Sequence, residues 1–290
     1  MATGTNIRTY FQGRWHEGDL AVIRAADQGA WLGGTVFDGA RYFDGLAPDL
    51  DLHCARVNRS AAAMSITPTV SAEDIVAIVR EGLAAYSPQQ SVYIRPMYWG
   101  IDVDAAGLAP EPNLTGFCVC LEEIPLPPAD AATTLTRTRF RRPVLETAVC
   151  NAKAGALYPN NARMLAEARA KGFGNALVAD AMGNVAESAT ANVFMVRDGV
   201  AFTPIANGTF LAGITRARHI ANLRAAGVEV VEAVLTFEDF HAADEVFLTG
   251  NFAKVTRVAR FDDTEYRSHA MADRARRLYW DWAAGTARAG

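Results

Sequence analysis

Three lysines, at positions 153, 171 and 254, carry all the side-chain amines of this 290-residue chain. Any reaction that needs a nucleophilic lysine therefore has three candidates. Lys171 stands before Gly172 at the expected end of a helix, where a cation suits the helix dipole, so we interpret it as a surface residue. Lys254 lies near an expected turn and is interpreted as structural. This leaves Lys153, in the segment NAKAGALYPNN, as the candidate for covalent catalysis.

Two features that follow Lys153 share a chemistry with it. Glu187 opens the run ESATANVF, and Gly213, Ile214 and Thr215 in LAGITR form a turn before an expected helix. A pyridoxal phosphate enzyme needs a lysine amine for the cofactor aldehyde, an anion beside the pyridine nitrogen, and donors for the phosphate. A helix N-terminus favours bound phosphate. Together these features predict a pyridoxal phosphate site.

The residue types also bear on the reaction. A lysine amine has a reference pKa of about 10.4 and is a poor nucleophile at neutral pH. Burial and nearby positive charge lower this pKa, and Arg59 and the pyridinium are the expected sources of that charge. A carboxylate at Glu187 keeps the pyridine protonated, so that the ring withdraws electrons from the substrate Cα more strongly. Glutamate at this position therefore favours transamination.

The segment 187–216 resembles the signature of the class IV aminotransferases, which are fold type IV pyridoxal phosphate enzymes. The matching positions are Glu187, Asn192, Phe194, Thr203 and the closing LAGITR. Ala201 is smaller than the aliphatic residue usual in the family. The segments TVFDGARYF, HCARVNR, YIRP, NAKAGALY and DEVFLTGNFAKV occur in the same order in branched-chain amino acid aminotransferases. The resemblance thus covers nearly the whole chain.

The resemblance implies a role for each of several residues toward the cofactor. Lys153 would attach the cofactor and then move a proton between the substrate Cα and the cofactor. Tyr158 would hydrogen-bond the 3-oxygen of the ring, Glu187 would pair with the ring nitrogen, and Leu211 would pack on the ring. The residues expected at the phosphate are Arg59, Gly213, Ile214, Thr215, Gly250 and Asn251.

The resemblance also implies a substrate site. The residues expected there are Phe37, Arg41, Tyr93, Arg95, Gly250 and Asn251. Tyr93 and Arg95 alternate on an expected strand, so their side chains should point to one face, where they would meet the substrate carboxylate. Leu32 stands where branched-chain enzymes usually have a tyrosine, and Phe252 adds bulk to a turn. Both departures bear on which substrate is taken.

Apolar spacing around these motifs predicts an α/β or α+β chain in two parts. Helices are expected over 52–66, 71–86, 160–171, 215–226 and 271–282, and strands over 91–99, 114–121, 175–179, 185–196, 228–235 and 245–249. The segment 124–133 holds three prolines and predicts an interdomain linker. Residues 1–123 would form an N-terminal α/β domain. Fold type IV implies that residues 134–290 form a C-terminal pseudo-barrel domain that binds the cofactor.

Composition narrows the class of protein. Half of the residues are apolar and 21% are charged, which is typical of globular proteins and excludes disordered and coiled-coil classes. A net charge of −4 predicts no nucleic-acid partner. No apolar run predicts a signal peptide or a membrane span, so we expect a cytoplasmic protein without a membrane partner. The four cysteines are expected as free thiols, and the scattered histidines predict no metal site.

The sequence therefore predicts a pyridoxal phosphate transaminase with small-molecule substrates. We expect ping-pong transfer from an L-branched-chain amino acid to 2-oxoglutarate or another keto acid. The resemblance implies a homodimer or higher homo-oligomer with a site between the domains, to which the partner subunit contributes near Leu32. The alternatives are an (R)-amine or D-amino acid transaminase of the same fold, an aminodeoxychorismate lyase, and a binding protein that carries the cofactor without turnover.

Overall fold

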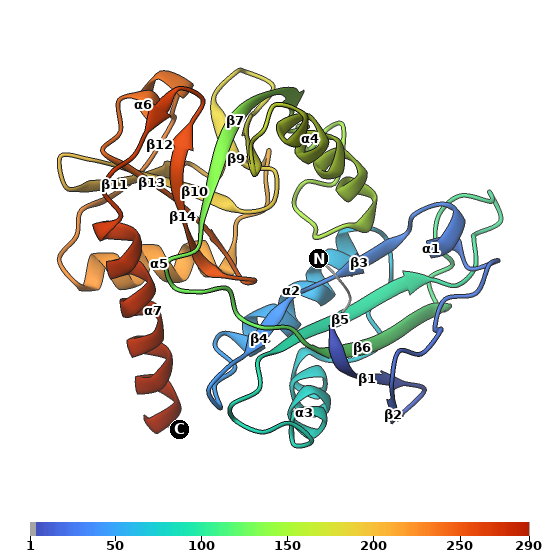
Figure 1. The fold of residues 1–290 in the computed structure, drawn as a ribbon. Helices are drawn as coiled ribbons and strands as arrows, with labels where there is room; N and C mark the ends of the chain where they lie inside the picture. Colours follow the sequence, from blue (N-terminus) through green and yellow to red (C-terminus); the bar gives the residue numbers. More distant parts are fainter. Residues whose placement is uncertain (1–3, 290) are drawn as a thin grey trace. The chain divides into compact units, whose positions relative to one another are not determined.

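The computed structural model describes residues 4–289 and divides into two compact units (Figure 1). The first unit comprises Met1–Leu126 and Asn151–Leu157, and the second comprises Pro127–Cys150 and Tyr158–Gly290. The division after Leu126 falls inside the proline-containing segment 124–133. The segment 151–157, which its place in the sequence assigns to the second part, belongs to the first unit. The reason is backbone pairing, because Ala154 forms a β-bridge with Val36.

The first unit is an antiparallel sheet with helices. Its strands are β1 (Thr5–Phe11), β2 (Arg14–Glu17), β3 (Thr35–Phe37), β4 (Ala40–Tyr42), β5 (Val92–Gly100) and β6 (Thr115–Glu123), in the order β2-β1-β6-β5-β3 with β4 beside β5. Its helices are α1 (Gln28–Trp31), α2 (Leu50–Ala63) and α3 (Ala72–Leu83), followed by the short 3₁₀ helix η1 (Gly155–Leu157). All the strand pairs in this sheet are antiparallel.

Alternation along β5 separates a core face from a polar face. Val92, Ile94 and Tyr98 are buried in one cluster with apolar residues of α2 and α3. Tyr93 and Arg95 occupy the intervening positions, so their side chains point to the opposite face of the sheet. Their shared face, predicted from the sequence, is confirmed by the Arg95 guanidinium, which lies 5.3 Å from the centre of the Tyr93 ring.

The second unit is a nine-stranded mixed sheet that curls on itself. Its strands are β7 (Ala132–Arg141), β8 (Asn175–Ala179), β9 (Val185–Ser188), β10 (Asn192–Arg197), β11 (Val200–Pro204), β12 (Val230–Ala233), β13 (Glu245–Gly250), β14 (Lys254–Phe261) and β15 (Thr264–Glu265). The order is β12-β11-β10-β13-β14-β7-β8-β9, with β15 beside β14. The curl brings β9 back toward the other edge, where Val185 N donates to Leu235 O over 2.7 Å.

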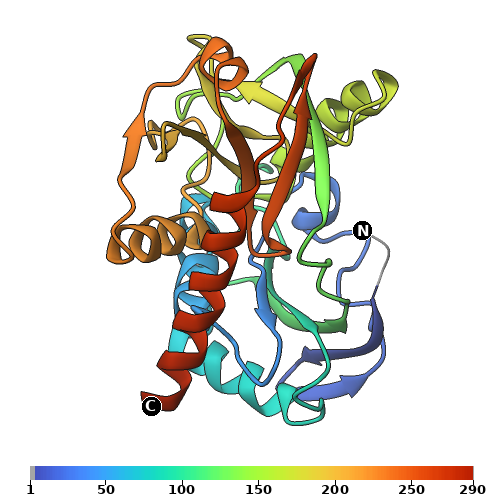
Figure 2. The ribbon, with the colours of Figure 1, turned by 60° about the vertical axis from the view of Figure 1, so that its left-hand side comes forward.

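The helices of the second unit are α4 (Tyr158–Ala170), α5 (Ile214–Ala225), α6 (Phe237–His241) and α7 (Ala270–Ala289). α5 and α7 lie side by side (Figure 2), and Asn222 Nδ2 of α5 donates to the Leu278 carbonyl of α7. Both faces of β10 are buried. Val193 packs inside the curled sheet, whereas Phe194 packs in a cluster with α5 and α7 and stacks on Phe247 at 5.0 Å.

The expected elements are found, with shifted ends. All five predicted helices are present, but α7 runs to Ala289 instead of ending at 282, because alanine and arginine continue a helix readily. The expected strand 185–196 is interrupted by a turn between β9 and β10, and the strand expected over 228–235 is shorter. The four cysteines are free thiols, as expected. Among residues 4–289, every helix is too short or too polar to cross a bilayer.

His219 of α5 is a fully buried histidine in this second unit. Its Nε2 lies 3.2 Å from the backbone oxygen of Lys254, and because a carbonyl only accepts, Nε2 carries the hydrogen. The imidazole ring lies 5.2 Å from the Tyr279 ring. Burial lowers the pKa of His219 to about 4, and the neighbouring Lys254 charge acts in the same direction. The folded protein therefore holds this imidazole neutral.

This pKa predicts a loss of stability in acid. An unfolded histidine has a pKa near 6.5, so between pH 6.5 and 4 the unfolded chain binds the proton and the folded chain does not. Stability from this group therefore falls as the pH is lowered, by about 3 kcal/mol across that range. We expect His219→Gln to show a correspondingly shallower loss in urea unfolding between pH 7 and pH 4.5. Identical pH slopes for the variant and the wild type would contradict this.

Candidate active site

Lys153 is fixed in the first unit by its backbone. Its N–H donates to Ser60 Oγ of α2 over 3.1 Å, and its carbonyl accepts from Phe37 N of β3 over 3.2 Å. The Lys153 ammonium lies 4.6 Å from the centre of the Phe37 ring. These backbone hydrogen bonds hold Lys153, a half-buried residue, in place without using its side chain.

Tyr93 lies between two arginines on the polar face of the first sheet. The Arg41 and Arg95 guanidinium carbons lie 5.6 Å and 5.3 Å from the centre of its ring. Arg41 is fully buried and donates to Ser91 Oγ and to the Ile124 carbonyl. Burial lowers the pKa of Arg41 to about 10, so the side chain stays charged at neutral pH. The positive charge beside Tyr93 suits a carboxylate, and the contact of these residues with the substrate stays a prediction.

The FDG segment fixes the Tyr93 hydroxyl. A Cβ added at Gly39 would lie 2.0 Å from Tyr93 Oη, so only glycine lets the ring approach this backbone. The preceding Asp38 is buried and accepts from His53 Nδ1 at 2.7 Å and from Arg56 Nε at 2.6 Å. Burial alone would raise the pKa of Asp38, but the charges and hydrogen bonds of Arg56 and His53 outweigh it and hold the pKa well below its usual range.

The structure places the two arginines of α2 differently. Arg59, expected at the phosphate, lies on the exposed side of the helix, and its role stays a prediction. The more buried guanidinium is that of Arg56, three residues earlier, which the sequence pattern places on a solvated face with Arg59 and does not predict as a site residue. The signal that could have found it is spacing. His53 and Arg56 are three residues apart and share a helix face, and both could meet one carboxylate.

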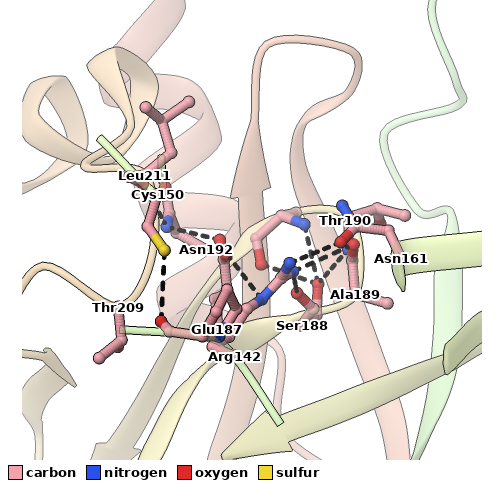
Figure 3. A network of polar contacts seen from close by, with 12 residues as sticks. Arg142, Cys150, Asn161, Glu187, Ser188, Ala189, Thr190, Asn192, Thr209 and Leu211 are labelled. Atoms are coloured by element: carbon pink, nitrogen blue, oxygen red, sulfur yellow. Dashed lines mark hydrogen bonds and ion pairs between the residues drawn. The ribbon is translucent and has the colours of Figure 1, made fainter. Parts of the chain in front are cut away.

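Glu187 is the centre of a buried polar network in the second unit (Figure 3). Its Oε1 lies 3.1 Å from Arg142 Nε, an ion pair without hydrogen-bond geometry. Its Oε2 accepts from Asn192 Nδ2 at 3.2 Å. Arg142 is itself anchored by Asn161 Oδ1 of α4 and by the Ser188 carbonyl. A cation and an amide therefore hold this carboxylate in place.

Asn192 links this carboxylate to the start of α5. Its Nδ2 also lies 3.2 Å from the Leu211 carbonyl, and a Cβ added at Gly213 would lie 2.1 Å from its Oδ1. α5 then begins at Ile214 with Gly213 as its N-cap, and a glycine has no side chain with which to cap the helix. The Thr215 side chain is buried in this first turn. The side-chain amide of Asn192 thus connects Glu187 to the LAGITR segment by hydrogen bonds.

The turn between β13 and β14 lies beside the same amide, because Asn192 pairs with Thr249 across the sheet. The buried Lys254 ammonium donates to Asn251 Oδ1. Because an ammonium can only donate, the atom of the Asn251 side-chain amide that faces Lys254 is the oxygen. The amide nitrogen, Nδ2, therefore points away from Lys254. Among the residues described, that buried Nδ2 has no hydrogen-bond partner. This contact fits the structural role that the sequence predicts for Lys254.

These donors fit pyridoxal phosphate. The uncapped N-terminus of α5 and the unpaired Asn251 amide suit its phosphate, with Gly250 adding no side chain. The Glu187 carboxylate suits a protonated ring nitrogen. Tyr158 opens α4 and is 40% exposed, and its contact with the cofactor stays a prediction, as does that of Leu211. Lys171, at the end of α4, pairs with Glu167 at 3.1 Å, which suits a surface role.

Comparison with known proteins decides the family. A model of the amino-transferase class IV family matches residues 35–261. The chain belongs to the class IV aminotransferases. These are pyridoxal phosphate enzymes, so the predicted cofactor and the transaminase class are confirmed.

Relatives of this class IV aminotransferase extend over almost the whole chain. The branched-chain-amino-acid aminotransferase of Salmonella typhimurium is 29% identical over 272 residues, covering 90% of this chain and 87% of the relative. A crystal structure of an aminotransferase from Brucella abortus bound to the co-factor PLP is 55% identical, with a TM-score of 0.94, covering 96% and 99% of the two chains. The branched-chain aminotransferase of Thermoproteus uzoniensis is 26% identical, with a TM-score of 0.87 and coverage of 96% and 95%. The predicted fold type IV is confirmed.

Proposed function

We propose that this class IV aminotransferase moves an amino group in two half-reactions, from an L-branched-chain amino acid to 2-oxoglutarate or another keto acid. The observation that carries the proposal is the Glu187 network, in which an ion-paired carboxylate is tied to an uncapped helix N-terminus. A protonated ring nitrogen and a phosphate need these two features. The similarity to branched-chain enzymes supports the substrate class.

Lys153 and Glu187 have distinct roles in this proposal. Bound pyridoxal phosphate supplies an acceptor for the electrons left when a proton leaves the substrate Cα. Lys153 Nζ would hold the cofactor through its aldehyde carbon and would carry the proton that leaves the substrate Cα. Such proton transfer by a positioned group contributes roughly 10²- to 10⁴-fold in rate. Glu187, held by Arg142, keeps the ring nitrogen protonated.

The polar face of the first sheet accounts for substrate binding. Tyr93 and Arg95 bind the substrate carboxylate, Arg41 adds positive charge beside them, and Phe37 lines the pocket. An apolar side chain is then recognised by shape, and one methylene is worth only about 1–3 kcal/mol. We therefore propose a broad preference among leucine, isoleucine and valine. The homodimer and the cytoplasmic location belong to the same proposal, and sedimentation of the purified protein tests the dimer.

A donor panel tests this function. The purified holoenzyme is given L-leucine, D-alanine or (R)-1-phenylethylamine with a keto-acid acceptor, and the cofactor absorbance and the amino acid formed are followed. We expect L-leucine to be converted fastest, with the cofactor band moving to that of the amine form. Faster turnover of D-alanine or of the (R)-amine would overturn the substrate class. A lack of amine-form cofactor with every donor would overturn transamination itself.

A further inference from the structure

We propose that Glu122 is a specificity-determining residue, which makes the substrate site favour molecules with one carboxylate over molecules with two. The proposal rests on the proposed function in assigning Tyr93 and Arg95 to the substrate carboxylate. It narrows the acceptor to keto acids with one carboxylate in preference to 2-oxoglutarate. The arrangement that carries it lies within the first unit and involves three neighbouring strands.

Register places four polar side chains on one sheet face. Arg41 of β4 lies opposite Tyr93 of β5, and Tyr93 lies opposite Glu122 of β6. Arg95 follows Tyr93 by two residues and therefore shares its face. Opposite residues on neighbouring strands bring their side chains together, and the Arg95 guanidinium forms an ion pair with Glu122 Oε1.

Glu122 is 3% exposed, whereas Arg95 is 28% exposed, so the carboxylate is the buried partner and the arginine reaches toward solvent. The second carboxylate oxygen accepts from Gly4 N at 2.8 Å. Glu122 also favours the charged form of Arg41, although burial opposes it. Both arginines therefore interact electrostatically with this one carboxylate.

The charges of these four side chains determine how much negative charge a bound ligand can carry. Arg41 and Arg95 are positive and Glu122 is negative, so the group carries one net positive charge around the Tyr93 ring. One substrate carboxylate balances that charge. A second carboxylate on the substrate would approach an arginine already paired with Glu122 and would be repelled by Glu122. The repulsion between two negative charges is strong where bulk water is excluded.

Ligand selectivity tests this role. Calorimetry on the holoenzyme measures the Kd of glutarate, a dicarboxylate, and of 4-methylpentanoate, a monocarboxylate. In Glu122→Gln the amide oxygen can still accept from Gly4 N and Arg95, while the negative charge is lost. We expect glutarate to bind about tenfold more tightly or better in this variant, with little change for 4-methylpentanoate.

Glu123→Gln is the matched control. Glu123 is the next residue of β6, points to the other face, and accepts from Gln90 Nε2 at 2.8 Å. We expect it to leave the ratio of the two Kd values unchanged. An unchanged ratio in Glu122→Gln, or an equal change in Glu123→Gln, overturns the inference. Turnover of L-leucine by the same preparations is read separately, so a failure of the proposed substrate is distinguished from a failure of the Glu122 inference.

Discussion

Lys153→Ala should lower kcat with L-leucine by about 10³-fold or more, because it removes both the amine that attaches the cofactor and the base that holds the Cα proton. The fold should persist, since Lys153 is bound to Ser60 and Phe37 through its backbone. The visible cofactor band of the purified enzyme should disappear with the activity. Steady-state kinetics and an absorbance scan measure both effects.

Lys171→Ala is the control for this variant. Lys171 lies at the exposed end of α4 and pairs with Glu167, and we expect kcat within about twofold of the wild type, as for surface substitutions. A small primary amine added to Lys153→Ala should restore part of the activity if the lost group acts as an amine. Retention of more than a tenth of the wild-type kcat by Lys153→Ala would refute the assignment.

Glu187→Gln should lower kcat by about 10²-fold while the cofactor stays attached, because a neutral amide cannot keep the ring nitrogen protonated. Asn192 Nδ2 can still donate to the new amide oxygen, so the geometry of the site should be kept. Arg142 would lose its ion-pair partner in a buried place, which costs stability of roughly 3–5 kcal/mol. Kinetics below the unfolding temperature measure the loss of kcat, and urea unfolding measures the loss of stability separately.

Glu167→Gln controls for removing an ion-paired carboxylate from the same unit. Glu167 lies on α4, where it pairs with Lys171 and accepts from Thr138 Oγ1. We expect its kcat to match the wild type. A wild-type kcat in Glu187→Gln would show that this carboxylate does not act on the cofactor ring.

Local patterns in the sequence predict most of the elements of this fold. Helical spacing locates α2 to α5 and α7, with α7 longer than expected. Alternation on β5 predicts that Tyr93 and Arg95 share a face, because strand periodicity is a property of the backbone alone.

The sequence does not show which residues far apart along the chain come into contact. Lys153 joins the first unit because Ala154 pairs with Val36, and nothing near either residue indicates that bridge. Arg142 reaches Glu187 from a loop remote in sequence. Glu122 reads as an ordinary strand carboxylate until the strand register places it opposite Tyr93. In each case the partner is set by the tertiary fold.

The covalent attachment at Lys153 is the central claim, and the small number of lysines allows a direct measurement. The purified holoenzyme is reduced with borohydride, digested and mapped by mass spectrometry. Three peptides can carry the pyridoxyl group on a side chain, those containing Lys153, Lys171 and Lys254. We predict that the added mass lies on Lys153 in stoichiometric amount. Its presence on Lys171 or Lys254, with Lys153 unmodified, would contradict the account.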